Sequence, residues 1–253
     1  MEIGVTVGDS VDRVEATATT DEFDFVEFGL GETADLSETV EGDRLDAARA
    51  ERDLDLVVHL PFKQVVATPV PEINDAIVGF QERLLAWAGE RGARKAVLHA
   101  TQRNPHDTDL RETFADQLVR VVAAGESHGV EVVVENVGHQ AKGLQLSVLA
   151  DIAAEVDAPV CFDVGHAYME DGNEGIERFL GACADRVSHL HVHDVRGRGD
   201  THMPLGAGDV DFDILAERLG DFGGTVAVEV FSDDAPLLRD SAKRIADVLG
   251  GEF

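Results

Sequence analysis

The residues best suited to chemistry lie in a stretch where histidines alternate with apolar side chains. Residues 187–194 read Val-Ser-His-Leu-His-Val-His-Asp. Successive side chains of a strand point to opposite faces, so His189, His191 and His193 should share one face while apolar residues pack on the other. A single histidine is usually solvated or a hydrogen-bonded core residue. Three in a row followed by Asp194 favour a metal site, because neutral imidazole is the commonest metal ligand.

Further acidic residues and histidines stand near the ends of other expected strands. Apolar or alternating runs indicate eight strands, at 2–7, 23–29, 54–60, 94–100, 130–137, 159–163, 187–194 and 225–231. Seven of these strands carry one such residue near their C-terminal ends: Glu27, His59, His99, Glu135, Asp163, His191 and Glu229.

Helical stretches are expected between the strands. They begin near Asp9 and Ser10 and then occupy 43–52, 71–92, 107–129, 144–156, 173–184, 212–219 and 236–249. Strands that alternate with helices imply parallel βαβ units. Eight units in a chain of 253 residues favour an α/β fold closed as a (β/α)8 TIM barrel, in one domain spanning residues 1–253. An open doubly wound sheet is the alternative, but residues 4–10 match its glycine-rich phosphate loop too loosely to count.

A barrel of this kind places its active site at the C-terminal ends of the strands, so the seven residues should face one mouth. Glu135, Asp163, His191 and Glu229 then form a mixed carboxylate and imidazole set that suits Mn²⁺, Zn²⁺ or a similar divalent ion. His166, three residues after Asp163, and the pair Asp200 and His202 could complete a second or third metal position.

The composition points to a soluble, cytoplasmic protein with an unusually acidic surface. The chain has 21 Lys and Arg against 50 Asp and Glu, a net charge of −29. Molar salt shortens the Debye length to about 3 Å, so a halophilic protein is expected. The charge mildly disfavours nucleic acid, which usually needs a basic patch. No apolar run is long enough to span a bilayer, and the two cysteines, Cys161 and Cys183, read as buried thiols.

Taken in order, these motifs resemble the xylose isomerase-like barrels, which include sugar and sugar-phosphate isomerases and epimerases and the endonuclease IV-type apurinic/apyrimidinic nucleases. The resemblance covers nearly the whole chain. It is carried by Asp-x-Val-Glu-Phe around Glu27, Glu135-Asn136, Asp163-x-x-His166, His191-x-x-Asp194 and the Leu-Gly-x-Gly-x-x-Asp-Phe run at 205–212.

For the isomerase branch, the resemblance implies one divalent metal, such as Mn, Zn, Mg or Co, held by Glu135, Asp163, His191 and Glu229. Glu135 and Glu229 would also be catalytic and move protons at a carbon next to a carbonyl. The side chains expected on the substrate are Glu27, His59, His99 and His166, with Lys63, Arg196 and Arg198 as candidate phosphate ligands. The expected partner is a small sugar or sugar phosphate and not a membrane, and a homo-oligomer is compatible with this interpretation.

The nuclease branch is the alternative. Its trinuclear zinc site would correspond to His59, His99, Glu135, Asp163, His166, His191, Asp200, His202 and Glu229, and all nine positions are filled here. Nucleic acid would be a partner only under this alternative. The chain lacks the Gly-Ala-His-Val-like first strand and the longer DNA-gripping loops of those nucleases, and Glu27 fits the sugar branch better. The sequence therefore favours the sugar isomerase or epimerase over the nuclease and over a metal-binding barrel without catalytic activity.

Overall fold

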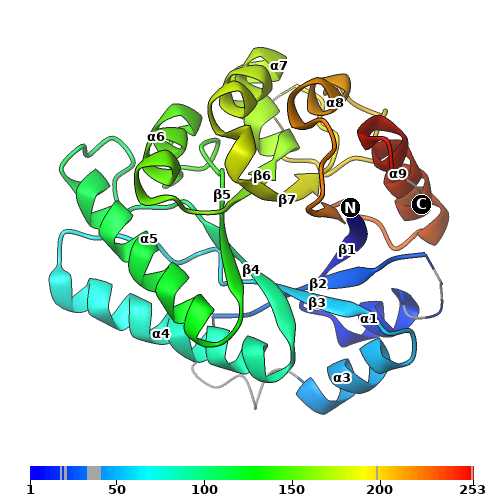
Figure 1. Cartoon of the computed structure of the whole chain (residues 1–253), viewed down its shortest axis with the longest axis horizontal. Helices are drawn as coiled ribbons and strands as arrows, with labels where there is room; N and C mark the ends of the chain where they lie inside the picture. Colours follow the sequence, from blue (N-terminus) through cyan, green and yellow to red (C-terminus); the bar gives the residue numbers. More distant parts are fainter. Residues whose placement is uncertain (18, 20–21, 33–40, 198, 252) are drawn as a thin grey trace.

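Eight parallel strands close into a barrel, which confirms the predicted fold (Figure 1). The computed structural model describes residues 1–17, 19, 22–32, 41–197, 199–251 and 253. Each strand pairs with the next one along the chain, and β1 also pairs with β8. The strands are β1 (Glu2–Gly8), β2 (Phe25–Gly29), β3 (Asp55–His59), β4 (Ala93–His99), β5 (Glu131–Glu135), β6 (Val160–Asp163), β7 (Val187–Val192) and β8 (Thr225–Val228).

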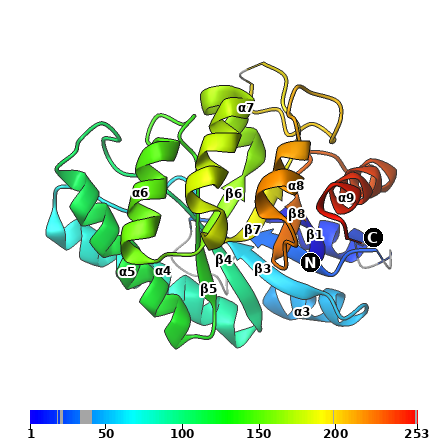
Figure 2. The same cartoon turned by 45° about the horizontal axis from the view of Figure 1, so that its top comes forward.

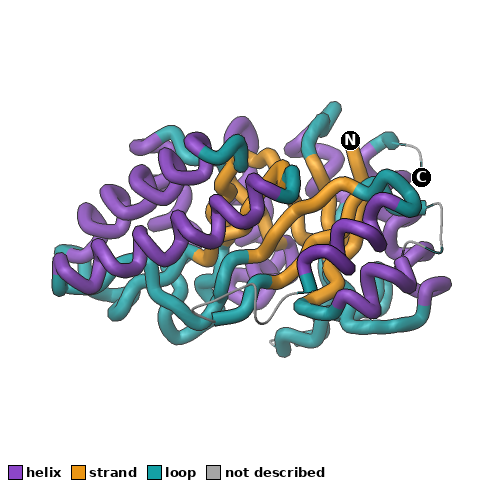
Figure 3. The backbone as a smooth tube through the Cα atoms, turned by 90° about the horizontal axis from the view of Figure 1, so that it is seen from below, coloured by secondary structure: helices purple, strands orange, loops and turns teal. Residues whose placement is uncertain are grey.

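The helices surround the barrel and pack their apolar faces on the outside of the strands (Figures 2 and 3). They are α1 (Val11–Thr17), α3 (Gly42–Ala50), α4 (Pro71–Glu90), α5 (Leu110–Ser127), α6 (Leu146–Val156), α7 (Val164–Cys183), α8 (Asp213–Leu219) and α9 (Ala235–Leu249), with a short 3₁₀ turn, η1 (Ala184–Arg186), before β7. Both chain termini lie beside α9. Among the described residues, no helix combines the length and apolar character that crossing a membrane requires.

The helix after β6 begins nine residues earlier than the sequence predicts. We expected a helix over 173–184, whereas α7 starts at Val164, directly after the strand. The Asp163 carboxylate caps this helix by accepting the backbone N–H of His166 at 2.6 Å. Gly172 interrupts the helical geometry at φ 67° and ψ −165°, so α7 is kinked there. Glycines in the first half of the helix obscured it in the sequence, because glycine is a poor helix former.

The barrel interior below the mouth is filled by a separate cluster of buried apolar side chains. It comprises Phe25, Val57, Val97, Val133, Cys161 and Ala227, one from each of six strands. A Cβ atom on Gly4 would come within 2.4 Å of the Phe25 ring, so glycine at this position makes room for the largest member. We call these six residues the lower layer. They close the barrel beneath the residues that the sequence singled out.

Candidate functional site

The candidate site is a polar layer directly above the lower layer. Side chains at alternate positions of a strand share a face, so residues two positions after the inward apolar ones also point into the barrel. The residues placed in this way are Glu27, His59, His99, Glu135, Asp163 and Glu229, and His191 follows the inward His189 on β7. We call these seven residues the upper layer. Glu229 comes one residue after β8 ends, whereas the sequence placed it on the strand.

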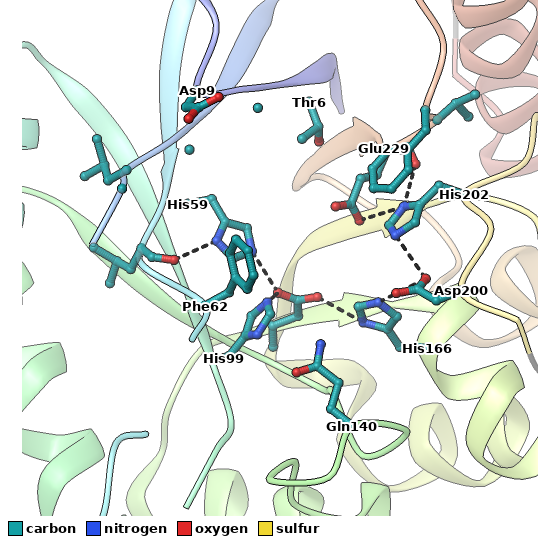
Figure 4. Close-up of a pocket in the computed structure, with 18 of the residues that line it drawn as sticks. Thr6, Asp9, His59, Phe62, His99, Gln140, His166, Asp200, His202 and Glu229 are labelled. Carbon is teal, nitrogen blue, oxygen red and sulfur yellow. Dashed lines mark hydrogen bonds and ion pairs between the residues drawn. The ribbon is translucent and has the colours of Figure 1, made fainter. Parts of the chain in front are cut away.

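A cavity of about 500 Å³ opens above the upper layer. This volume falls within the range of small-molecule sites, roughly 300–1,000 Å³. Figure 4 shows side chains from several elements converging on it, including His59 of β3, His99 of β4, His166 of α7, and His202 and Glu229 from the loops after β7 and β8. The upper-layer residues that line it are His59, His99, Glu135 and Glu229. Asp163 and His191 are completely buried beneath them.

Glu135 is the centre of a connected set of imidazoles. His59 Nε2 and His99 Nε2 lie 3.2 and 3.1 Å from Glu135 Oε2. The other oxygen, Oε1, lies 3.1 Å from His166 Nδ1. The contacts continue from His166 through Asp200 to His202, whose Nε2 lies 3.0 Å from Asp200 Oδ1 (Figure 4). One buried carboxylate thus joins two histidine clusters.

The four residues that the resemblance implies as metal ligands meet around one atom, His191 Nδ1. His191 Nδ1 lies 3.5 Å from Glu135 Oε1, 3.8 Å from Asp163 Oδ2 and 3.4 Å from Glu229 Oε2. Donor atoms about 2.1 Å from a tetrahedral ion would lie about 3.4 Å apart. His191 Nδ1, Asp163 Oδ2 and Glu229 Oε2 are buried and have no hydrogen-bond partner. Because buried polar atoms normally have partners, these four side chains fit a divalent cation.

Two further groupings extend the potential ligand set. His59, His99 and Glu135 bring three ligand atoms within 4.8 Å of one another, and His166, His193, Asp200 and His202 bring four. His193 was part of the histidine row in the sequence but was not a predicted ligand. It follows β7, and its Nε2 lies 3.2 Å from Asp163 Oδ1. A Cβ atom on Gly165 would come within 2.2 Å of the His193 ring, which explains the glycine between Asp163 and His166.

Asp194 explains the glycine-rich motif that follows the histidine row. Its buried carboxylate accepts the backbone N–H groups of Val195, Gly206, Gly208 and Val210 at 2.7–3.2 Å. Gly206 has φ +84°, and a Cβ atom on Gly208 would come within 2.3 Å of Asp194. Asp194 therefore ties down the loop at 195–210, which carries Asp200 and His202 to the cavity.

Burial and neighbouring charges act in opposite directions on the pKa values of the buried site residues. Burial alone would raise the pKa of Glu135, but the charges of His99 and His191 hold it well below its ordinary value. Burial would lower the pKa of His166, but the charge of Asp163 and the hydrogen bond to Glu135 raise it to about 10. The same balance raises the pKa of His191. Protons on imidazoles thus supply the positive charge that a divalent cation can replace.

Some of the predicted substrate-binding residues line the cavity and others do not. His59, His99 and His166 line the cavity, whereas Glu27 is fully buried below it. Lys63 and Arg196 are not among the described residues that line the cavity. Arg196 instead donates to the carbonyl of Ala207 at 2.7 Å, and Lys63 lies over the Phe62 ring. Arg198 lies outside the described residues. The sequence identified strand ends correctly but could not give the direction of long side chains in loops.

Several side chains in or beside the cavity were not predicted from the sequence. Arg13, Gln140 and Phe231 line the cavity, with Phe231 stacked on His202 at a centroid distance of 3.8 Å. Beside it, His139 packs on His166 at a ring-centroid distance of 4.1 Å, and its Nε2 lies 3.7 Å from Asp200 Oδ2. The signal for His139 in the sequence is that a histidine occurs shortly after the end of β5. Arg13 comes from α1 and gave no signal in the sequence.

Comparisons with known proteins agree with this architecture. A family model described as a xylose isomerase-like TIM barrel matches residues 14–248. An uncharacterised protein of Methanocaldococcus jannaschii is 23% identical over 201 residues, covering 72% of this chain and 66% of that protein, slightly less than two thirds of its length. A D-tagatose 3-epimerase-like protein is 20% identical with a TM-score of 0.77, covering 99% of this chain and 97% of that one. The IolI protein with a bound zinc atom is 17% identical with a TM-score of 0.77, covering 99% and 98%. Such low identities to solved structures show a shared fold.

Proposed function

The chain belongs to the xylose isomerase-like TIM barrels, and from that premise we propose that it is a divalent-metal-dependent isomerase or epimerase of sugars or sugar phosphates. The observation that carries the proposal is the group of ligand atoms around His191 Nδ1, which lies 3.4–3.8 Å from oxygens of Glu135, Asp163 and Glu229. Two of these residues, Glu135 and Glu229, also line the cavity. Similar solved structures include a D-tagatose 3-epimerase-like protein, a D-psicose 3-epimerase and a protein with bound zinc, which supports the same proposal.

The chemistry follows from the position of the two glutamates. Removing a proton next to a carbonyl needs a base near that carbon and positive charge near the oxygen. A bound divalent cation would supply that positive charge. Glu135, from β5, and Glu229, from beyond β8, line the same cavity from different strands. One glutamate would take the proton and the other would return it, either on the opposite face or to the neighbouring carbon. The first outcome is epimerisation and the second is aldose–ketose isomerisation.

The cavity also suits the rest of a sugar. His59, His99 and Gln140 offer polar atoms for hydroxyl groups, and Phe62 and Phe231 offer apolar faces. Among the described residues that line the cavity, Arg13 is the one with a Lys or Arg side chain. It therefore replaces Lys63 and Arg196 as the candidate ligand for a phosphate. Asp233 Oδ1 lies 3.0 Å from Arg13 Nε, so this carboxylate already shares its charge.

A phosphodiester hydrolase is a second candidate, because one observation favours it. His59 and His99 flank Glu135 at 3.2 and 3.1 Å, and a second cluster contains His166, Asp200 and His202. A one-metal isomerase does not need these two groups as ligands, whereas a multinuclear hydrolase uses several ions to generate its nucleophile. The net charge of −29 disfavours a polyanionic substrate.

A paired assay tests the proposal. Purified protein at high salt is incubated with a panel of ketoses and ketose phosphates in deuterated water, and the exchange of carbon-bound protons and any new isomer are followed by NMR. In parallel, the same protein is tested for nicking of a DNA duplex that contains an abasic site. We expect exchange and isomer formation without nicking.

Two variants make the assay decisive. His59→Ala and His202→Ala should change substrate affinity while the ion at Glu135, Asp163, His191 and Glu229 stays bound. The opposite result would show that the protein is the hydrolase instead. In that case wild type would nick the duplex and turn over no sugar, and His59→Ala would abolish both nicking and metal binding.

A further inference from the structure

Glu27 occupies an unusual position, because it is a carboxylate buried inside the barrel below the cavity. Glu27, His189 and His191 are all completely inaccessible to solvent. Glu27 comes from β2 and the two histidines from β7, and these strands are not neighbours in the barrel. The Glu27 side chain therefore reaches across the interior to make its contacts.

One oxygen of Glu27 joins the two imidazoles. Glu27 Oε2 lies 3.0 Å from His189 Nε2 and 2.9 Å from His191 Nε2. An ionised carboxylate has no proton to donate, so both Nε2 atoms must carry hydrogen and donate to Oε2. The remaining ring nitrogen of His191, Nδ1, points the other way, toward Glu135, Asp163 and Glu229. The hydrogen bond to Glu27 thus leaves Nδ1 as the atom that can bind a cation.

The other histidine holds Glu27 in place. His189 Nδ1 lies 2.6 Å from Thr225 Oγ1, and Thr225 pairs with His189 in the register of β7 and β8. His189 is therefore fixed at both ring nitrogens, and Glu27 is fixed by His189 as well as by His191. The buried row Thr225, His189, Glu27 and His191 runs from the wall of the barrel to the other three candidate ligands, Glu135, Asp163 and Glu229.

We infer that Glu27 is a positioning residue: it sets the tautomer and orientation of His191 so that Nδ1 binds the metal, and it does not contact substrate. Histidines that bind metals generally donate their second N–H to a carboxylate or carbonyl, and loss of that partner typically costs 10- to 100-fold in metal affinity or activity. The inference rests on the proposed function, because it requires a metal at His191. It also replaces the role in substrate binding that the sequence suggested for Glu27.

The experiment measures metal affinity in the absence of substrate. Metal-free wild type, Glu27→Gln and Glu27→Met are titrated with Co²⁺ against a chromophoric chelator, and the visible spectrum of each Co²⁺-loaded protein is recorded. Gln keeps an acceptor oxygen but loses the charge, and Met removes both. We expect Co²⁺ affinity to fall about 10-fold in Glu27→Gln and about 100-fold or more in Glu27→Met, with an altered spectrum.

Glu131→Gln is the matched control. Glu131 lies on the barrel at the start of β5, where its carboxylate contacts Lys95 at 2.9 Å and Ser188 at 2.9 Å, away from the cavity. This variant loses the same charge by the same substitution. It should bind Co²⁺ like wild type and give the same spectrum. Circular dichroism of every metal-free variant checks that it is folded.

A measurement on wild type covers the case in which the Glu27 variants do not fold. NMR of the Zn²⁺-loaded protein with ¹⁵N-labelled histidine should show His191 protonated on Nε2 and bound to metal through Nδ1. The opposite tautomer, or Co²⁺ affinity and spectra that are unchanged in folded Glu27 variants, would overturn the inference while leaving the proposed function intact. Wild type that binds no divalent metal would overturn both.

Discussion

Two layers of side chains fill the barrel, two residues apart along most of its strands, and they differ in chemistry. The lower layer is apolar and includes Phe25, Val57 and Val133. The upper layer is built of carboxylates and imidazoles, and five of its seven residues have a buried side-chain atom without a hydrogen-bond partner. TIM barrels usually fill their interior with bulky branched residues. The contrast teaches that a shift of two residues separates the part that holds the barrel together from the part that can bind a ligand.

Neutralising one upper-layer carboxylate should give the largest effect. Glu229→Gln removes both a candidate metal ligand and a proton-transfer group without changing side-chain size. We expect bound metal to be lost and turnover to fall roughly 10²–10⁴-fold, the range that general acid–base groups contribute. Elemental analysis of the purified protein and the exchange assay check this result. Full activity together with full metal content would remove Glu229 from the proposed site.

Truncating the lower layer should affect stability and not chemistry. Phe25→Ala removes a fully buried ring and should lower the free energy of unfolding by about 3–5 kcal/mol. Metal content per folded chain should stay that of wild type, since Phe25 does not line the cavity. Denaturant unfolding and elemental analysis test the two parts separately. Loss of metal from folded Phe25→Ala would mean that the layers are not independent.

The loop at 195–210 should lose its anchor when Asp194 is replaced. Asp194→Asn offers one acceptor oxygen in place of two, so backbone N–H groups of Gly206 and Gly208 lose their acceptor. We expect a loss of about 1–3 kcal/mol and faster hydrogen exchange at these amides. Asp209→Asn is the control, because the exposed Asp209 accepts one N–H, from Gly197 at 3.3 Å. Equal exchange in both variants would contradict the anchoring role of Asp194.

The stability of the metal-free protein should depend on pH through His166. Its pKa is raised to about 10 in the folded chain, mainly by Asp163 and Glu135 acting against burial. Its stabilising contribution is therefore complete below the unfolded pKa of about 6.5 and is lost as pH rises toward 10. Denaturation midpoints of chelator-treated protein should fall over this range, and less so in His166→Gln. Parallel pH profiles for the two proteins would refute this assignment.

The fold and most of the upper layer were predictable because both follow from the two-residue period of a strand. His59, His99, Glu135 and Asp163 could be placed at one mouth once eight parallel strands were recognised. The same period also predicts that Glu27 points inward. The period does not give the depth of the Glu27 side chain in the barrel. The contact between Glu27 and His191 also joins strands that are far apart in the sequence.

Residues outside the strands were harder to place. Lys63 and Arg196 follow strand ends, yet Arg196 bends back to bond Ala207, and Arg13 reaches the cavity from α1. Loop geometry decides these directions, and no period in the sequence records it. Asp194 differs from these residues, because a motif in the sequence corresponds to its contacts: the glycines at 206 and 208 are explained by its hydrogen bonds to the backbone there. The need for high salt at a net charge of −29 stays a prediction.

Metal content is the most direct test of the account. The wild-type protein, purified without added chelator, is analysed for all first-row divalent metals per folded chain and then assayed for proton exchange before and after chelation. We expect at least one bound divalent metal, loss of exchange on its removal, and recovery when Mn²⁺, Co²⁺ or Zn²⁺ is returned. Protein that catalyses exchange equally well with no metal bound would contradict the account.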